Sequence, residues 1–179
     1  SYDPITGLNI SGEYGRIRKG TYFSSNRWQV QNSLHRHNMP GYTYRVERIE
    51  KNSQIGTSTG DWWRQRGNAS YQVWKFQPFI TYEGEIKKEN WSDSLFTGFR
   101  FNDYKMGIET KGNSRIIASA SLSYRKDDDY TGKNLFTEKS TAITQNYQLR
   151  LQQFRNFSSS VEFTHRVRKF ADTSIDNKQ

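Results

Sequence analysis

The sequence predicts an all-β protein that folds as an antiparallel up-and-down meander of long hairpins. Apolar and polar residues alternate over long stretches, and no comparable stretch has the i, i+3, i+4 spacing of an amphipathic helix. Short breaks recur about every 40 residues, so each period is one long hairpin. We expect about eight or nine strands, paired in chain order. Residues 23–170 form the predicted meander, residues 1–22 a Gly-rich lead-in or loop, and residues 171–179 a polar tail.

The alternation predicts one apolar and one polar face for each strand. Successive strand side chains point to opposite faces, so residues of equal parity share a face. From residue 116 the even positions are apolar, whereas Ser and Arg hold most of the odd ones. Later strands repeat the pattern. The residues predicted to share the apolar face are Ile116, Ala118, Ala120, Leu122, Tyr124, Tyr147, Leu149, Leu151, Val161 and Phe163.

The predicted connections alternate in length. Short breaks fall near residues 37–41, 75–77, 111–114 and 154–156, and longer polar ones near 51–61, 88–94 and 126–140. Short turns at one end and long loops at the other are typical of an up-and-down barrel in an outer membrane. A propeller blade has a similar period but packs four short strands into it, which disfavours a propeller.

The composition favours a single-layer sheet or barrel wall. The chain has 179 residues, of which 32% are hydrophobic, and its mean hydropathy is −1.00, so a large two-sided core is hard to fill. Aromatic residues make up 15%, which argues against a disordered chain. No run approaches the length of apolar residues that a transmembrane helix needs. The polar ends read as interior sequence, so we expect a fragment of a longer chain.

Charge and cysteine content exclude several classes of site. The chain has no cysteine, which excludes disulfide scaffolds, zinc ribbons and thiol nucleophiles. Its net charge of +9 is explained by a solvated basic surface, and nucleic acid or anionic lipid headgroups are the sharper alternatives. Most aromatic residues alternate with the Arg and Lys residues and so lie on the opposite face. A stacking platform needs both on one face, so we expect no nucleic-acid partner.

Aromatic residues near strand ends predict two interfacial girdles. Trp63 and Trp74 bracket one strand, about 36 Å apart along it. With a strand tilt of about 40° this spans roughly 28 Å, close to the thickness of a bilayer core. Aromatic staples at the ends of a soluble sheet are the alternative explanation. The predicted girdle residues are Trp63, Trp74, Phe79, Trp91, Phe157 and Phe170.

From Trp62 to Phe170 the chain resembles large Gram-negative outer-membrane β-barrel proteins. The resemblance rests on the stretches WWRQRGNASYQVW, IIASASLSYRKDDDY and NYQLRLQQFRNFSSSVEFTHRVRKF. The resemblance lies in the general pattern of alternating strands and polar loops. It includes no diagnostic motif, so it transfers no functional residue. The resemblance implies a transmembrane β-barrel segment in the bacterial outer membrane that serves transport, secretion or membrane anchoring.

The three histidines are weak candidates for a metal site or a proton-linked switch. His35 and His37 have the spacing that places both on one strand face, where a pair can bind a metal. No Cys or carboxylate cluster joins them, which favours a loop or strand-end role. His165 lies on the predicted apolar face, where a tolerated interfacial histidine is favoured over a proton-linked switch.

Acidic residues form two further candidate sites. Asp127, Asp128 and Asp129 are predicted to form a loop tip that could hold Ca²⁺ or bridge lipopolysaccharide through divalent ions, although a solvated loop is favoured. Glu83 and Glu85 share a predicted face and could form a glycosidase-like pair, although alternating Glu on a wet face is commoner.

These observations favour a non-enzymatic protein with no catalytic residues and no cofactor. Membrane lipid and lipopolysaccharide are the expected partners, together with other envelope proteins. The alternative function is a soluble extracellular β-sheet module that binds carbohydrate or protein. What covers the apolar face discriminates between the two: lipid in the first, and a second layer of protein in the second.

Overall fold

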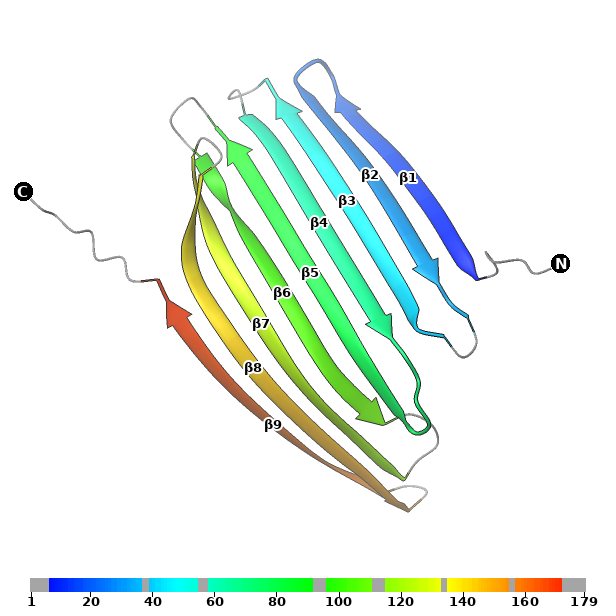
Figure 1. Ribbon diagram of the computed structural model, residues 1–179. Helices are drawn as coiled ribbons and strands as arrows, with labels where there is room; N and C mark the ends of the chain where they lie inside the picture. Colours follow the sequence, from blue (N-terminus) through cyan, green and yellow to red (C-terminus); the bar gives the residue numbers. More distant parts are fainter. Residues whose placement is uncertain are drawn as a thin grey trace, which may run out of the picture.

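The computed structural model is one nine-stranded antiparallel sheet in which each strand pairs with its neighbours in the chain (Figure 1). The structure describes residues 7–36, 39–54, 58–91, 96–110, 115–132, 135–154 and 157–171. No helix occurs within these ranges. The predicted fold class, an all-β meander, is confirmed. The strands are β1 (Leu8–Lys19), β2 (Phe23–Leu34), β3 (Gly41–Ser53), β4 (Ser58–Ser70), β5 (Phe76–Asn90), β6 (Phe96–Thr110), β7 (Ile116–Gly132), β8 (Leu135–Phe154) and β9 (Phe157–Phe170).

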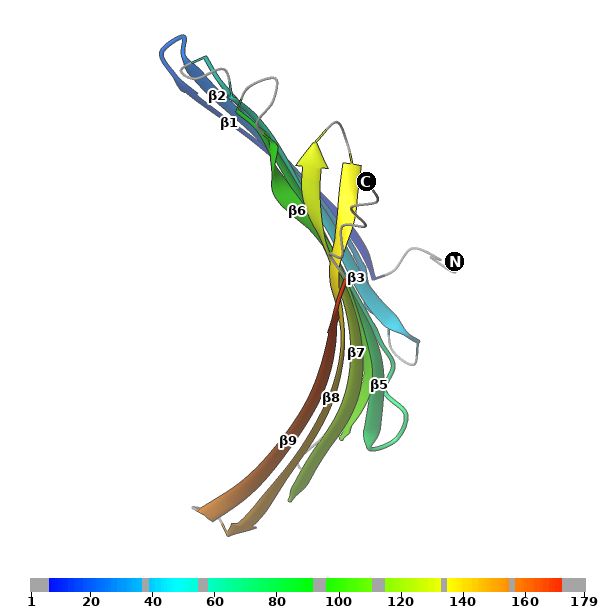
Figure 2. The same cartoon turned by 90° about the vertical axis from the view of Figure 1, so that its left-hand side faces the viewer.

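The sheet is twisted and bowed but remains open (Figure 2). β1 and β9 are its two edges, and neither has a second strand partner in the described part of the chain. An unpaired edge presents a row of backbone donors and acceptors that a further strand can use.

Two sequence-based expectations about chain organisation are corrected. Residues 1–22, expected as a lead-in or loop, contain β1, whose twelve residues pair with β2. The expected long loops at 51–61 and 126–140 are also wrong, because β3 and β4 cover most of the first range and β7 and β8 most of the second. Of the expected loop at 88–94, residues 88–90 belong to β5, and residues 92–94 lie outside the described residues. The described segments were expected to be loops because their residues are mostly polar. They are instead parts of strands with polar residues on both faces.

The described part of the chain has almost no protein core. Its only buried hydrophobic residues are Tyr130 and Ala142. Large apolar side chains are instead exposed, including Val161 at 69%, Ile80 at 60% and Met106 at 58% of their surface. A sheet normally buries one face against a second layer. Here no second layer is present among the described residues, so the apolar surface lies open.

The strand register determines which residues share a face. Leu122 pairs with Met106 on β6 and with Gln145 on β8, and paired residues point to the same side of the sheet. Following these pairs from β1 to β9 divides the sheet into two faces. We call the side that carries Leu122 the apolar face and the side that carries Glu47 the charged face.

Candidate functional site

The apolar face carries a continuous band across all nine strands. On β7 it extends from Ile116 to Tyr124, and each neighbouring strand contributes the residues paired with this part of the sheet. All ten residues that the alternation placed on one apolar face lie in it. We define the apolar band as the apolar-face positions within residues 8–14, 28–34, 42–46, 63–69, 78–86, 102–108, 116–124, 143–151 and 159–167.

No position of the apolar band is Asp, Glu, Lys or Arg. Its polar members carry amide, hydroxyl or imidazole groups, such as those of Gln145 and His165. The absence of charge is selective, because a quarter of the whole chain is charged. On the charged face, the same strands carry Arg, Lys, Asp and Glu at the same height.

The apolar band is tallest on β5, β7, β8 and β9. Ile116 and Tyr124 are separated by about 26 Å along β7 at 3.3 Å per residue, and strand tilt reduces the height along the membrane normal to about 24 Å. The outward apolar band of outer-membrane barrels is about 25 Å tall. On β3 the band covers only Tyr42 to Val46, about 13 Å along the strand. The band thus approaches the height of the hydrocarbon layer on four strands and is shorter on the others.

The apolar band runs obliquely to the rows of the sheet. We call a row a set of residues that are paired side by side from one strand to the next. The upper limit of the band is Tyr14 on β1 but Tyr124 on β7, which lies in the same row as Ile10. The two upper limits are therefore four residues apart along the strand direction. With strands about 4.8 Å apart, this shift corresponds to strands tilted by about 25° relative to the upper edge of the band. Strands in closed barrels tilt in the same way, by about 35–45°.

The predicted aromatic girdle is only partly on the apolar face. Trp63 lies there at the upper limit of the band, where its ring makes an edge contact with Trp28 at 5.3 Å between centroids. Trp74 and Trp91 lie exposed just beyond β4 and β5. The assignment of Phe79 and Phe170 is corrected: their register places both on the charged face. The side chain of Phe157 lies outside the described residues.

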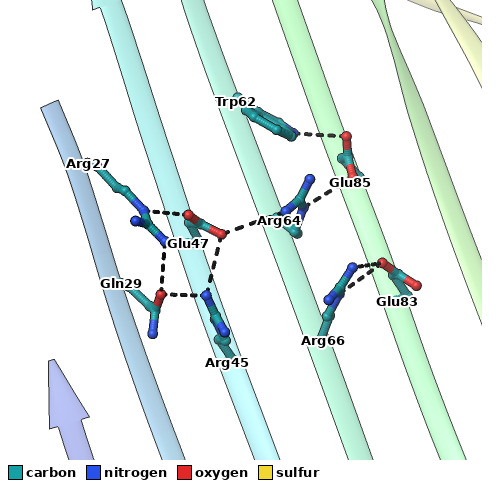
Figure 3. A network of polar contacts seen from close by, with 9 residues as sticks. All are labelled: Arg27, Gln29, Arg45, Glu47, Trp62, Arg64, Arg66, Glu83 and Glu85. Atoms are coloured by element: carbon teal, nitrogen blue, oxygen red, sulfur yellow. Dashed lines mark hydrogen bonds and ion pairs between the residues drawn. The ribbon is translucent and has the colours of Figure 1, made fainter. Parts of the chain in front are cut away.

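The charged face carries a ladder of cross-strand ion pairs (Figure 3). Arg27 Nε donates to Glu47 Oε1 at 2.6 Å, and a guanidinium nitrogen of Arg64 lies 3.9 Å from Glu47 Oε2. Arg64 Nε in turn donates to Glu85 Oε2 at 3.3 Å, so the ladder links β2 to β5. The Glu47 side chain is only 8% exposed. Packed and paired charges of this kind suit a wet surface between neighbouring strands.

A second polar cluster joins β7, β8 and β9 on the charged face. Asp127 Oδ1 accepts a hydrogen bond from Arg125 Nε at 2.8 Å, and Arg168 lies 3.7 Å from its other oxygen. Arg168 also donates to the hydroxyl of Ser140, a residue with no exposed surface. The ladder and this cluster show that the charged face is internally neutralised over much of its area.

The curvature places the charged face on the inside of a bend. Figures 1 and 3 view opposite sides of the sheet, because the strand order runs right to left in the first and left to right in the second. Figure 3 views the charged face, so Figure 1 views the apolar face. The apolar face lies to the right in Figure 2, where β8 and β9 are convex towards the right. The charged face therefore lies on the concave side of these strands. A lumen-facing surface lies on the inside of a barrel wall in the same way.

Above the apolar band, at the top of Figure 1, the strands continue with mostly polar residues on the apolar-face side, whereas the charged face also carries Ile17, Ile49 and Phe99 there. A polar hollow of 460 Å³ lies here on the apolar-face side, with Arg48, Asp61, Lys88 and Tyr130 in its lining. Further along, the Lys126 ammonium donates to the Glu138 carboxylate at 2.6 Å. This hydrogen bond raises the pKa of Lys126 and keeps the ammonium charged.

The three adjacent aspartates of the sequence do not converge on one point in the structure. Asp127 to Asp129 lie within β7 rather than in a loop tip, which corrects that expectation. Asp128 points to the face opposite Asp127 and pairs with Arg100 at 2.7 Å, so the three carboxylates cannot converge. No cluster of three or more metal-ligating side chains occurs among the described residues.

The glutamate and histidine candidates lie on different faces of the sheet. Glu83 and Glu85 share the charged face as predicted, and each is held by an arginine, Arg66 and Arg64 respectively. His165 lies on the apolar face opposite Gln145. His37 lies outside the described residues, so the pairing of His35 with it stays untested. The ion-pair ladder was not found from the sequence, although alternating charge signs become visible once the register is known.

Comparison of the chain with family models, curated proteins and solved structures gives no match. Within the residues that the structure describes, no helix is long and apolar enough to cross a membrane.

Proposed function

We propose that this chain is a wall segment of a β-barrel in the bacterial outer membrane, with a non-enzymatic role in transport, secretion or membrane anchoring. The observation that carries the proposal is the uncharged apolar band on one face of a single-layer sheet. An exposed apolar surface of this extent is unfavourable in water, because each Å² of apolar area costs about 25 cal/mol to hydrate. Hydrocarbon tails remove this cost without any further protein.

The charged face supports the same proposal from the other side. Its Arg–Glu ladder lies on the inside of the bend, where a barrel would hold water. Alternation of lipid-facing and water-facing residues along every strand is typical of barrel walls. The oblique course of the band adds a strand tilt of the kind that barrels need.

The direction of the edge strands explains how such a wall would be completed. In a nine-stranded antiparallel meander, β1 and β9 run in the same direction. Their direct pairing would be parallel, so an all-antiparallel ring needs an odd number of additional strands. Bacterial single-chain barrels have even strand numbers, which fits a segment of a larger wall.

A second candidate is a soluble extracellular module that binds carbohydrate or protein. The polar hollow favours it, since hydroxyl, amide and carboxylate groups from Ser24, Asn26, Thr59 and Asp61 line one cavity. This candidate requires another protein layer over the apolar band, and a partner would have to supply it.

Membrane extraction tests the two proposals against each other. Washed membranes from cells that produce the protein should retain it in alkaline carbonate and in concentrated urea, and release it only in detergent. Release by carbonate alone would contradict the wall segment and favour the soluble module.

A further inference from the structure

Basic residues mark the upper limit of the apolar band. On six strands the first charged apolar-face residue above the band is Arg or Lys, whereas on β4 it is Asp61 and on β8 it is Glu138. We call these six residues the basic collar: Arg16, Arg48, Lys88, Arg100, Lys126 and Lys169. They follow the oblique upper edge of the band from β1 to β9.

The basic collar keeps a net positive charge after its internal ion pairs are counted. Arg48 pairs with Asp61 at 2.9 Å and with Glu50 at 2.9 Å. Arg100 pairs with Asp128 at 2.7 Å, and Lys126 with Glu138 at 2.6 Å. The six cations of the collar are thus balanced by four carboxylates, which leaves a net charge of about +2. Arg16 and Lys169, at the two ends of the collar, have no ion-pair partner among the described residues. Anions that approach this edge of the band therefore meet a surplus of cations.

Aromatic rings and polar groups accompany the collar. Arg48 stacks over Trp63 at 4.7 Å, and the Lys88 ammonium lies 5.7 Å from the centroid of Tyr130. Arg48 and Lys88 also line the polar hollow. Aromatic and basic side chains together are enriched where a membrane protein leaves the hydrocarbon layer, because the rings stay amphipathic and the cations reach the headgroups.

We propose that the basic collar binds the phosphate groups of anionic lipid headgroups in the leaflet that surrounds the upper end of the strands. The proposal rests on the wall segment proposed above. Charge complementarity supports it: the headgroup phosphates of a leaflet that contacts the band lie directly above the hydrocarbon, at the height of the collar. Cations near such a surface attract anionic lipid over a distance of about one Debye length.

Tryptophan quenching by brominated lipids tests the collar in the intact protein, because Trp28 and Trp63 lie at the upper limit of the band. The protein is reconstituted in phosphatidylcholine vesicles that contain, at equal mole fraction, either brominated phosphatidylglycerol or brominated phosphatidylcholine. We expect phosphatidylglycerol to be enriched around the protein about fivefold at low salt. The enrichment should approach one in 1 M salt, where the Debye length is about 3 Å.

Two triple variants with equal charge changes locate the effect. Arg16→Gln, Lys88→Gln and Lys169→Gln remove collar cations, and we expect the lipid preference to fall at least twofold. The control variant carries Lys105→Gln, Arg150→Gln and Arg166→Gln, all on the charged face, and should keep the preference.

The outcomes separate the collar from the wall segment. Equal quenching by the two lipids in the wild-type protein contradicts the collar alone, since the band still meets lipid. Absence of quenching by either lipid contradicts the wall segment and the collar together. Loss of preference in the control variant, or its retention in the collar variant, also contradicts the collar. The wild-type ratio and its salt dependence decide the matter if a variant fails to fold.

Discussion

The two faces of the sheet are built from the same nine strands, but their side chains differ in what they contact. Side chains of the charged face form ion pairs with one another, whereas those of the apolar face are largely exposed. On the charged face, Glu47 lies among three arginines and has little exposed surface. On the apolar face, Val161 and Ile80 make few contacts and are more than half exposed. The charged face is satisfied by its own cross-strand pairs, whereas no described residue covers the apolar face.

This difference predicts that the two faces need different surroundings. A single-layer sheet with two wet faces would carry charge on both, as the strands do above the apolar band. The loss of charge from one face, over a height that approaches that of a hydrocarbon layer on four strands, predicts that the two faces respond differently to the same substitution.

The largest expected effect comes from placing a charge in the apolar band. Leu122→Arg should reduce the free energy of unfolding from vesicles by about 2–4 kcal/mol, the cost of an arginine near a bilayer midplane. Ser121→Arg, one residue away on the charged face, should change it by less than about 0.5 kcal/mol because the guanidinium stays wet. Chemical denaturation followed by tryptophan fluorescence measures both, and equal losses would remove the distinction between the faces.

A smaller effect is expected within the ion-pair ladder. Glu47→Gln leaves Arg27, Arg45 and Arg64 close together without their shared carboxylate, and should cost about 1–3 kcal/mol of unfolding free energy. Glu83→Gln is the matched control, because Glu83 and its partner Arg66 are exposed and their pair contributes at most about 1 kcal/mol. If Glu83→Gln is as costly as Glu47→Gln, the ladder has no special role on the charged face.

The smallest effect concerns close packing on the charged face at Gly107. An added Cβ there would lie 2.6 Å from the backbone oxygen of Ala120 and 2.7 Å from the ring of Phe79, so Gly107→Ala should destabilise the sheet by about 1–2 kcal/mol. Gly15 has open space around it, and Gly15→Ala should be neutral or slightly stabilising. The same unfolding assay compares the two, and a neutral Gly107→Ala would contradict this packing.

The sequence predicts the faces well because strand periodicity is local. From Ile116 to Tyr124 apolar residues hold every even position, although Ile117 is apolar as well, and their register with Tyr147 and Phe163 follows once the strands pair in order. Strand ends were predicted poorly, since a strand that is polar on both faces has the composition of a loop. This is why the acidic residues of β7 were expected in a loop tip.

Contacts between strands were largely beyond sequence reasoning. Arg27 and Glu47 are separated by twenty residues, and only the register of β2 with β3 brings them together. Phe79 was assigned to the girdle from its position near a strand end, although its parity differs from that of Ile80 and places it on the charged face. The basic collar likewise appears only when the strands are aligned.

The most direct test of the central claim is the accessibility of single cysteines at positions 121 and 122 in membranes. The chain has no native cysteine, so labelling is specific. If lipid covers the apolar band, Leu122→Cys resists a water-soluble thiol reagent but reacts with a reagent carried on lipid, whereas Ser121→Cys shows the reverse pattern. Protection of position 122 from both reagents would mean that protein covers the band, and would contradict the wall segment.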